Sequence, residues 1–143
     1  LPADIDSQAE GSHNGTNYIA YTFYVENRSD NTMNYWYQVV LDDVIKRVDE
    51  ALRVTIFLNG EKKVYAKVNS TTKEPEGNTI PFNDAKEIIV EPRENFNSGE
   101  IDKITVVISI DGNEPECLDD LIGGEIKMHM SILEEHVEQE NNI

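Results

Sequence analysis

Residues 111–120, DGNEPECLDD, carry the side chains of this sequence that are best suited to binding a metal ion. Carboxylate and amide oxygens are the hard ligands that Ca²⁺ prefers. Their spacing does not follow the twelve-residue loop of an EF-hand. Two interpretations therefore stay open: a solvated acidic connection between two strands, and a calcium site, with calcium the one cofactor that the sequence suggests. The candidate calcium ligands are Asp111, Asn113, Glu114, Asp119 and Asp120.

Residue patterns for catalysis are missing from the sequence. The three histidines, His13, His129 and His136, are scattered, and no HExxH motif occurs, whereas a catalytic zinc site needs three protein ligands and an open position. Cys117 is the only cysteine, so the chain has no internal disulfide and no cysteine pair for zinc. It also lacks a GxSxG motif and the glycine-rich loops that bind phosphates or dinucleotides. We therefore predict a protein that is not an enzyme and has no catalytic residues.

Aromatic residues gather in two segments, and Trp36 is the one singled out as a candidate ligand-binding residue. Tyr and Trp combine an apolar ring with a polar group, a combination that suits a carbohydrate-binding or adhesin module. Such a module predicts an exposed aromatic row on one sheet face. Because the aromatics occupy both faces of two predicted strands, we expect most of them in the core or in cross-strand pairs. They are Tyr18, Tyr21, Tyr24, Tyr35, Trp36 and Tyr37.

The charge balance excludes several classes of partner. Twelve basic against twenty-eight acidic residues give a formal net charge of -16. This charge repels nucleic acid and anionic membrane surfaces, and it favours cationic partners or divalent cations. No apolar run approaches the roughly 20 residues that span a bilayer, so no membrane insertion is expected.

The elements that must position these residues are mainly strands, because apolar residues alternate with polar ones along most of the chain. In one such segment Tyr35, Tyr37, Val39 and Leu41 share a face. Seven or so strands at this spacing predict an antiparallel β-sandwich. The segments that alternate are 18–26, 35–41, 54–68, 104–110 and 126–132.

Three local signals refine this prediction. Asn59-Gly60 between alternating runs predicts a tight hairpin, because both residues tolerate positive φ. Pro92 is expected to end a short strand over residues 86–92. Asp42 or Asp43 can cap a short helix, reaching to about residue 52, that crosses between the sheets.

The domain organisation follows from these elements. Residues 18–133 are expected to form a single β-sandwich domain. Residues 1–17 are polar and contain glycine, so we predict a flexible N-terminal segment, and residues 134–143 form a charged C-terminal tail.

Turn and strand motifs in this order resemble the TasA/camelysin family of secreted Gram-positive proteins. The likeness covers about residues 18–133, with Ser98 standing where the family usually has proline in a turn. The motif residues are Val25 and Asn27, then Ala51, Leu52 and Val54, then Asn59 and Gly60, and finally Gly99 and Glu100.

The resemblance implies a jelly-roll-like sandwich that is exported by a signal peptide and located outside the cell or at its surface. An export signal upstream of Leu1 would then have been removed. Some members belong to biofilm matrix and form fibres by donating a strand to the next subunit. The camelysin branch carries a metallopeptidase label, but this sequence supplies no zinc ligands for that activity. The expected partner is a second copy joined by edge-strand addition, or another surface protein.

Overall fold

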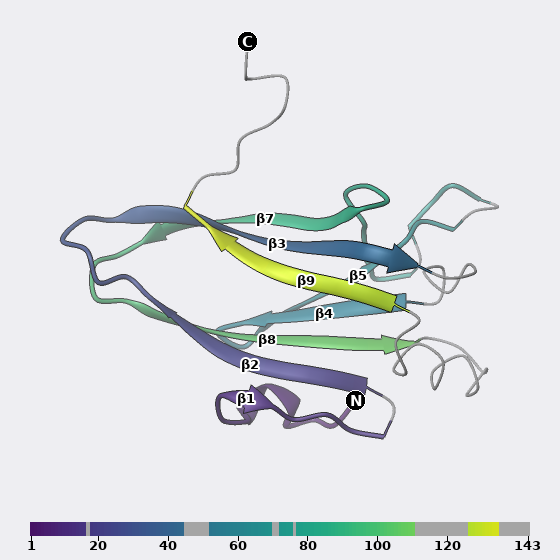
Figure 1. The fold of residues 1–143 in the computed structure, drawn as a ribbon, viewed down its shortest axis with the longest axis horizontal. Coiled ribbons are helices and arrows are strands. Elements are labelled where there is room, and N and C mark those ends of the chain that lie inside the picture. Colours follow the sequence, from purple (N-terminus) through teal and green to yellow (C-terminus); the bar gives the residue numbers. More distant parts are fainter. Residues whose placement is uncertain (17, 45–51, 70–71, 76, 111–125, 135–143) are drawn as a thin grey trace, which may run out of the picture.

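Two β-sheets packed face to face make up the protein in a computed structural model, as predicted (Figure 1). The structure describes residues 1–16, 18–44, 52–69, 72–75, 77–110 and 126–134. The larger sheet has the order β1-β2-β8-β4-β5-β6, and the smaller has the order β7-β3-β9. Every pairing is antiparallel except that of β5 with β6. The strands are β1 (Gly11–Ser12), β2 (Tyr18–Glu26), β3 (Met33–Val44), β4 (Leu52–Leu58), β5 (Glu61–Ala66), β6 (Ile80–Pro81), β7 (Glu87–Phe96), β8 (Ile101–Ile110) and β9 (Ile126–Leu133).

The main core lies between the two sheets, and alternation along the strands supplies it. On β3, Tyr35, Tyr37, Val39 and Leu41 are all buried, which confirms that they share a face and shows that this face points inward. Strand β8 contributes Ile104, with no exposed surface. Burial of this many large apolar side chains is the main force holding the sheets together.

The β4–β5 hairpin confirms the prediction made from Asn59-Gly60. Leu58 pairs with Glu61, so the turn has two residues. Asn59 has φ 52° and Gly60 has φ 87°. Two positive φ values are those of the primed turn whose twist matches that of the flanking strands.

Strand β3 continues where a helix was expected. Asp42 and Asp43 belong to β3, so neither caps a helix, and β4 has already begun at Leu52. Pairing explains the extension, because Asp43 lies opposite Lys127 of β9 and the next residue continues the ladder. Residues 45–51, the rest of the expected helix, lie outside the described residues.

Pro92 does not end its strand, contrary to the prediction. Strand β7 runs on to Phe96, with Pro92 paired to Trp36. Because β7 is the edge of the smaller sheet, it needs its N–H groups on one side only, and proline is tolerated at such positions.

The N-terminal segment, expected to be flexible, packs on the outer face of the larger sheet. Ile5, in the short 3-10 helix Ile5–Ser7, is 3% exposed and joins a second small core with Ala20, Phe57 and Val107. Strand β1 pairs with β2 over two residues only. The segment therefore covers apolar residues that the sandwich itself leaves outside. Within the described ranges no helix is long and apolar enough to cross a membrane.

Candidate functional site

The predicted calcium ligands lie outside the described residues, which stop at Ile110 and resume at Ile126. The structure therefore does not place Asp111, Asn113, Glu114, Asp119 or Asp120, nor Cys117. Among the residues it does describe, no three His, Cys, Asp or Glu side chains come together in a group that could hold a metal ion.

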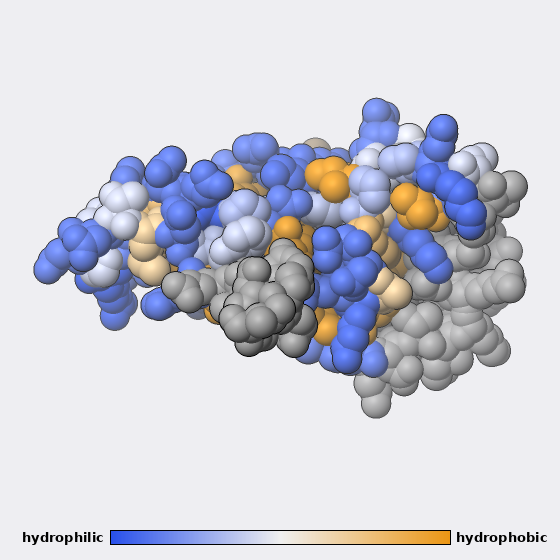
Figure 2. Space-filling view, turned by 90° about the horizontal axis from the view of Figure 1, so that it is seen from above, coloured by the Kyte–Doolittle hydropathy of each residue, from blue (hydrophilic) through white to orange (hydrophobic). Residues whose placement is uncertain are grey.

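Trp36 lies on the outer face of the smaller sheet, where it is half-buried. Its neighbours across the strands are Pro92 of β7 and Leu133 of β9. This row is apolar but holds a single aromatic ring, so the described part of the face lacks the aromatic row that a sugar-stacking platform predicts. Figure 2 shows this face from above, with hydrophobic residues as separate spots among hydrophilic ones wherever grey atoms do not cover it.

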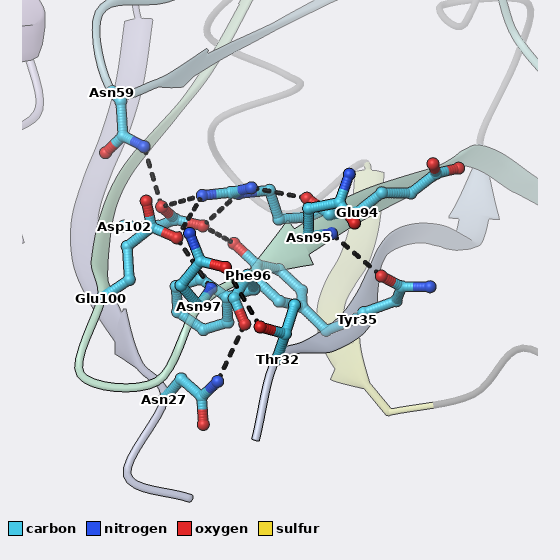
Figure 3. Close-up of polar contacts among 12 residues, drawn as sticks. Asn27, Thr32, Tyr35, Asn59, Glu94, Asn95, Phe96, Asn97, Glu100 and Asp102 are labelled. Carbon is cyan, nitrogen blue, oxygen red and sulfur yellow. Dashed lines mark hydrogen bonds and ion pairs between the residues drawn. The ribbon is translucent and has the colours of Figure 1, made fainter. Parts of the chain in front are cut away.

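A dense polar arrangement surrounds Asp102, which has no exposed surface (Figure 3). Its Oδ2 accepts hydrogen bonds from Tyr35 Oη at 2.8 Å and Arg93 Nε at 2.7 Å. Its Oδ1 accepts from Asn59 Nδ2 at 2.8 Å and Arg93 Nη2 at 3.1 Å. Arg93 Nη2 also lies 3.1 Å from Glu100 Oε1. We call these five residues, Tyr35, Asn59, Arg93, Glu100 and Asp102, the Asp102 cluster.

The cluster joins the two sheets. Tyr35 and Arg93 belong to β3 and β7 of the smaller sheet, whereas Asp102 belongs to β8 of the larger sheet and Asn59 to the β4–β5 turn. The guanidinium of Arg93 also stacks 5.2 Å from the centre of the Phe96 ring. Such a contact adds a cation–π attraction to the ion pair.

Electrostatics keep Asp102 ionised. Burial alone would raise the pKa of Asp102, but the hydrogen bonds from Arg93, Asn59 and Tyr35 outweigh it and hold that pKa below its ordinary value. The pKa of Arg93 is raised, chiefly by its hydrogen bond to Asp102. Burial and the neighbouring Asp102 raise the pKa of the Tyr35 phenol far above its ordinary value. Because each Asp102 oxygen already accepts two hydrogen bonds, the carboxylate is suited to holding the sheets rather than to attacking a substrate.

Sequence reasoning missed this cluster, although a signal for it exists. Asp102 continues the inward series of Ile104, Val106 and Ile108 on β8, so an acidic residue stands where the alternation calls for an apolar one. A charge at an inward position is rare unless it is paired. No sequence pattern identifies Arg93 as the partner, because that requires knowing that the consecutive strands β7 and β8 belong to opposite sheets.

Some residues that carry the family resemblance meet beside the cluster. Asn27 is 2% exposed and donates from Nδ2 to Phe96 O at 2.9 Å. Its backbone N–H donates to Glu100 O, and its carbonyl accepts from Gly99 N. Gly99 has φ 81°, which glycine adopts without strain. These motif residues therefore fasten the β2–β3 and β7–β8 turns to each other.

The two lateral sides of the sandwich differ in character. On the side where β5 faces β7, charged residues occupy strand positions that face the interior. They are Glu61, Lys63, Glu91 and Arg93. The other side is bordered by β9 in the smaller sheet and, in the larger sheet, by β2 with the two-residue strand β1 beyond it. There Tyr21 is 50% exposed and Ile132 is 38% exposed, although both have inward register. We give the name β2–β9 opening to four residues at interior-facing positions of these two strands: Tyr21, Phe23, Met130 and Ile132.

Searches against protein-family models, curated proteins and solved structures find no match to this chain.

Proposed function

We propose that the protein is a non-enzymatic structural or interaction module that joins another chain by strand addition at the β2–β9 opening. The observation that carries this proposal is the exposure of Tyr21 and Ile132 on inward-facing positions beside a strand edge. Exposed apolar side chains at inward-facing positions on the border of a sandwich are suited to being covered by another chain.

The free edge of β9 supplies the backbone groups for such an addition. In the described structure β9 pairs with β3 on one side only, over Trp36 to Val44. An unpaired edge presents N–H and C=O groups to a further strand. Alternate side chains of an added strand would point inward and cover the half-exposed residues of the opening. The charged border on the opposite side, with Glu61 and Lys63, disfavours the same reaction there.

Net charge sets the conditions for association. A charge of -16 on each copy opposes the approach of a second copy. Salt, divalent cations or acid reduce this repulsion. Assembly with itself is therefore expected to depend on calcium, salt or pH, and the acidic residues among 111–120 are the candidate ligands for calcium.

The resemblance to the TasA/camelysin family supports the same direction, because strand donation and a location at the cell surface or in biofilm matrix are features of that family. We propose an extracellular or cell-surface location on this basis. Another surface protein is the alternative partner for the same edge.

The test is light scattering after size exclusion, in low salt, in millimolar calcium and at about pH 5, where carboxylates begin to protonate. Ile132→Asp places a charge in the opening and is expected to abolish association. Ile101→Asp is the matched control, because Ile101 is 54% exposed but faces outward on β8. Ile132→Asp is expected to destabilise the fold more than Ile101→Asp, because Ile132 is 38% exposed and Ile101 54% exposed, so circular dichroism first establishes that both variants are folded.

A chain that stays monomeric in all three conditions contradicts self-association. Equal loss of association in both variants would show that any added charge acts by repulsion, and it would argue against the β2–β9 opening as the site.

A further inference from the structure

We propose that Asn59 is a deamidation site whose reaction is controlled by the Asp102 cluster. Asn59 precedes Gly60, and an asparagine followed by glycine is chemically the most labile arrangement for this reaction, because no side chain shields the next backbone nitrogen. Gly60 is exposed, and a Cβ built on it would meet nothing within 4 Å. Water and base therefore reach the turn freely.

The reaction proceeds within the chain and needs only water. The Gly60 backbone nitrogen loses its proton to solvent base and attacks Cγ of Asn59. A C–N bond forms, the Cγ–Nδ2 bond breaks, and ammonia leaves with a proton taken from water. The resulting succinimide adds one water at either carbonyl and yields aspartate or isoaspartate at position 59.

The folded turn opposes this attack, because the Asn59 side chain is held at both ends. Nδ2 donates to Asp102 Oδ1 at 2.8 Å, and Oδ1 accepts from Lys103 N at 2.8 Å. The backbone N–H of Asn59 also donates to Lys103 O at 2.9 Å. Cγ must rotate towards the Gly60 nitrogen, and that rotation breaks both side-chain hydrogen bonds. The reaction therefore requires local opening of the cluster.

The product cannot return to the same place. A carboxylate at position 59 would face the Asp102 carboxylate in place of a donor, and Arg93 already pairs with Asp102 and Glu100. Like charges at hydrogen-bond distance repel each other, and Asp102 loses one donor. Deamidation is thus expected to loosen the connection between the sheets irreversibly.

Peptide mapping by mass spectrometry tests the first half of the proposal. The full chain and a synthetic peptide of residues 54–65 are incubated in the same mildly alkaline buffer, and the mass gain at position 59 is followed. We expect the peptide to react at least about 30-fold faster, because opening two hydrogen bonds, one of them to a charged group, precedes attack in the folded chain. Equal rates in protein and peptide would overturn the proposal.

Two variants test the second half. Asn59→Asp reproduces the product, and Asn59→Gly removes the side chain while keeping the positive φ of the turn. In urea unfolding at neutral pH, Asn59→Asp is expected to have an unfolding constant about tenfold larger than that of Asn59→Gly. The difference should vanish in acid, where one carboxylate takes up a proton. If Asn59→Asp is at least as stable as Asn59→Gly at neutral pH, the carboxylates do not oppose each other and the proposal fails.

Discussion

Replacing Asp102 with asparagine is the sharpest test of the contact between the sheets. Asp102→Asn keeps the size of the side chain and an oxygen that accepts from Tyr35, but it removes the charge that pairs with Arg93. The Arg93 side chain is 18% exposed, and its partner has no exposed surface. Breaking this pair removes the buried counter-charge of a largely buried guanidinium and leaves it only the partly exposed Glu100 carboxylate. We expect a loss of about 2–4 kcal/mol in the free energy of unfolding.

The pH dependence of this loss follows from the lowered pKa of Asp102. The unfolded chain binds the proton more tightly than the folded chain, so folding stability falls as pH falls. The contribution of the carboxylate is complete above its unfolded pKa, near 3.9, and is lost as pH falls through the lower folded value. The difference between the original chain and Asp102→Asn should therefore be constant above about pH 5 and shrink below about pH 4.

Urea unfolding followed by tryptophan fluorescence and circular dichroism measures both effects. Tyr35→Phe is the companion variant, because it removes one neutral donor to Asp102 and should cost about 1 kcal/mol. A stability of Asp102→Asn within about 0.5 kcal/mol of the original chain at every pH would refute the view that this ion pair fastens the sheets.

Two further substitutions test other parts of the fold. Ile5→Ala is expected to weaken the packing of the N-terminal segment on β2 by about 2–4 kcal/mol. The loss should appear as faster amide exchange at residues 18–26. Leu1→Ala is the control, because the Leu1 side chain is 60% exposed and its removal should leave that exchange nearly unchanged. Gly60→Ala should lower the free energy of unfolding by roughly 1–2 kcal/mol, because alanine is strained at the positive φ of this position. Gly77→Ala is the control and should leave the free energy of unfolding nearly unchanged, because Gly77 has no such φ. A Cβ at either position would meet nothing within 4 Å.

The sandwich could be predicted from sequence because each long strand carries its own signal. Alternation on β3 predicts that Tyr35, Tyr37 and Val39 share a face, and Asn59-Gly60 predicts the hairpin turn. These are local properties of neighbouring residues, so the chain displays them without its fold.

What sequence reasoning missed depends on pairing between distant segments. The extension of β3 through Asp43 needs β9 as a partner, and Pro92 is tolerated only because β7 lies at an edge. The bond from Tyr35 to Asp102 joins residues 67 apart in the chain. The burial of Ile5 likewise requires an outer sheet face that only the assembled fold provides.

The central proposal, strand addition at β9, is tested most directly by amide hydrogen exchange of residues 126–133 in the monomer and in the associated protein. Association is produced by calcium or acid and checked by light scattering in the same samples. We predict that these amides become markedly slower to exchange on association, because a new strand supplies acceptors for the free edge. Unchanged exchange in this segment, with new protection elsewhere on the molecule, would contradict the proposal.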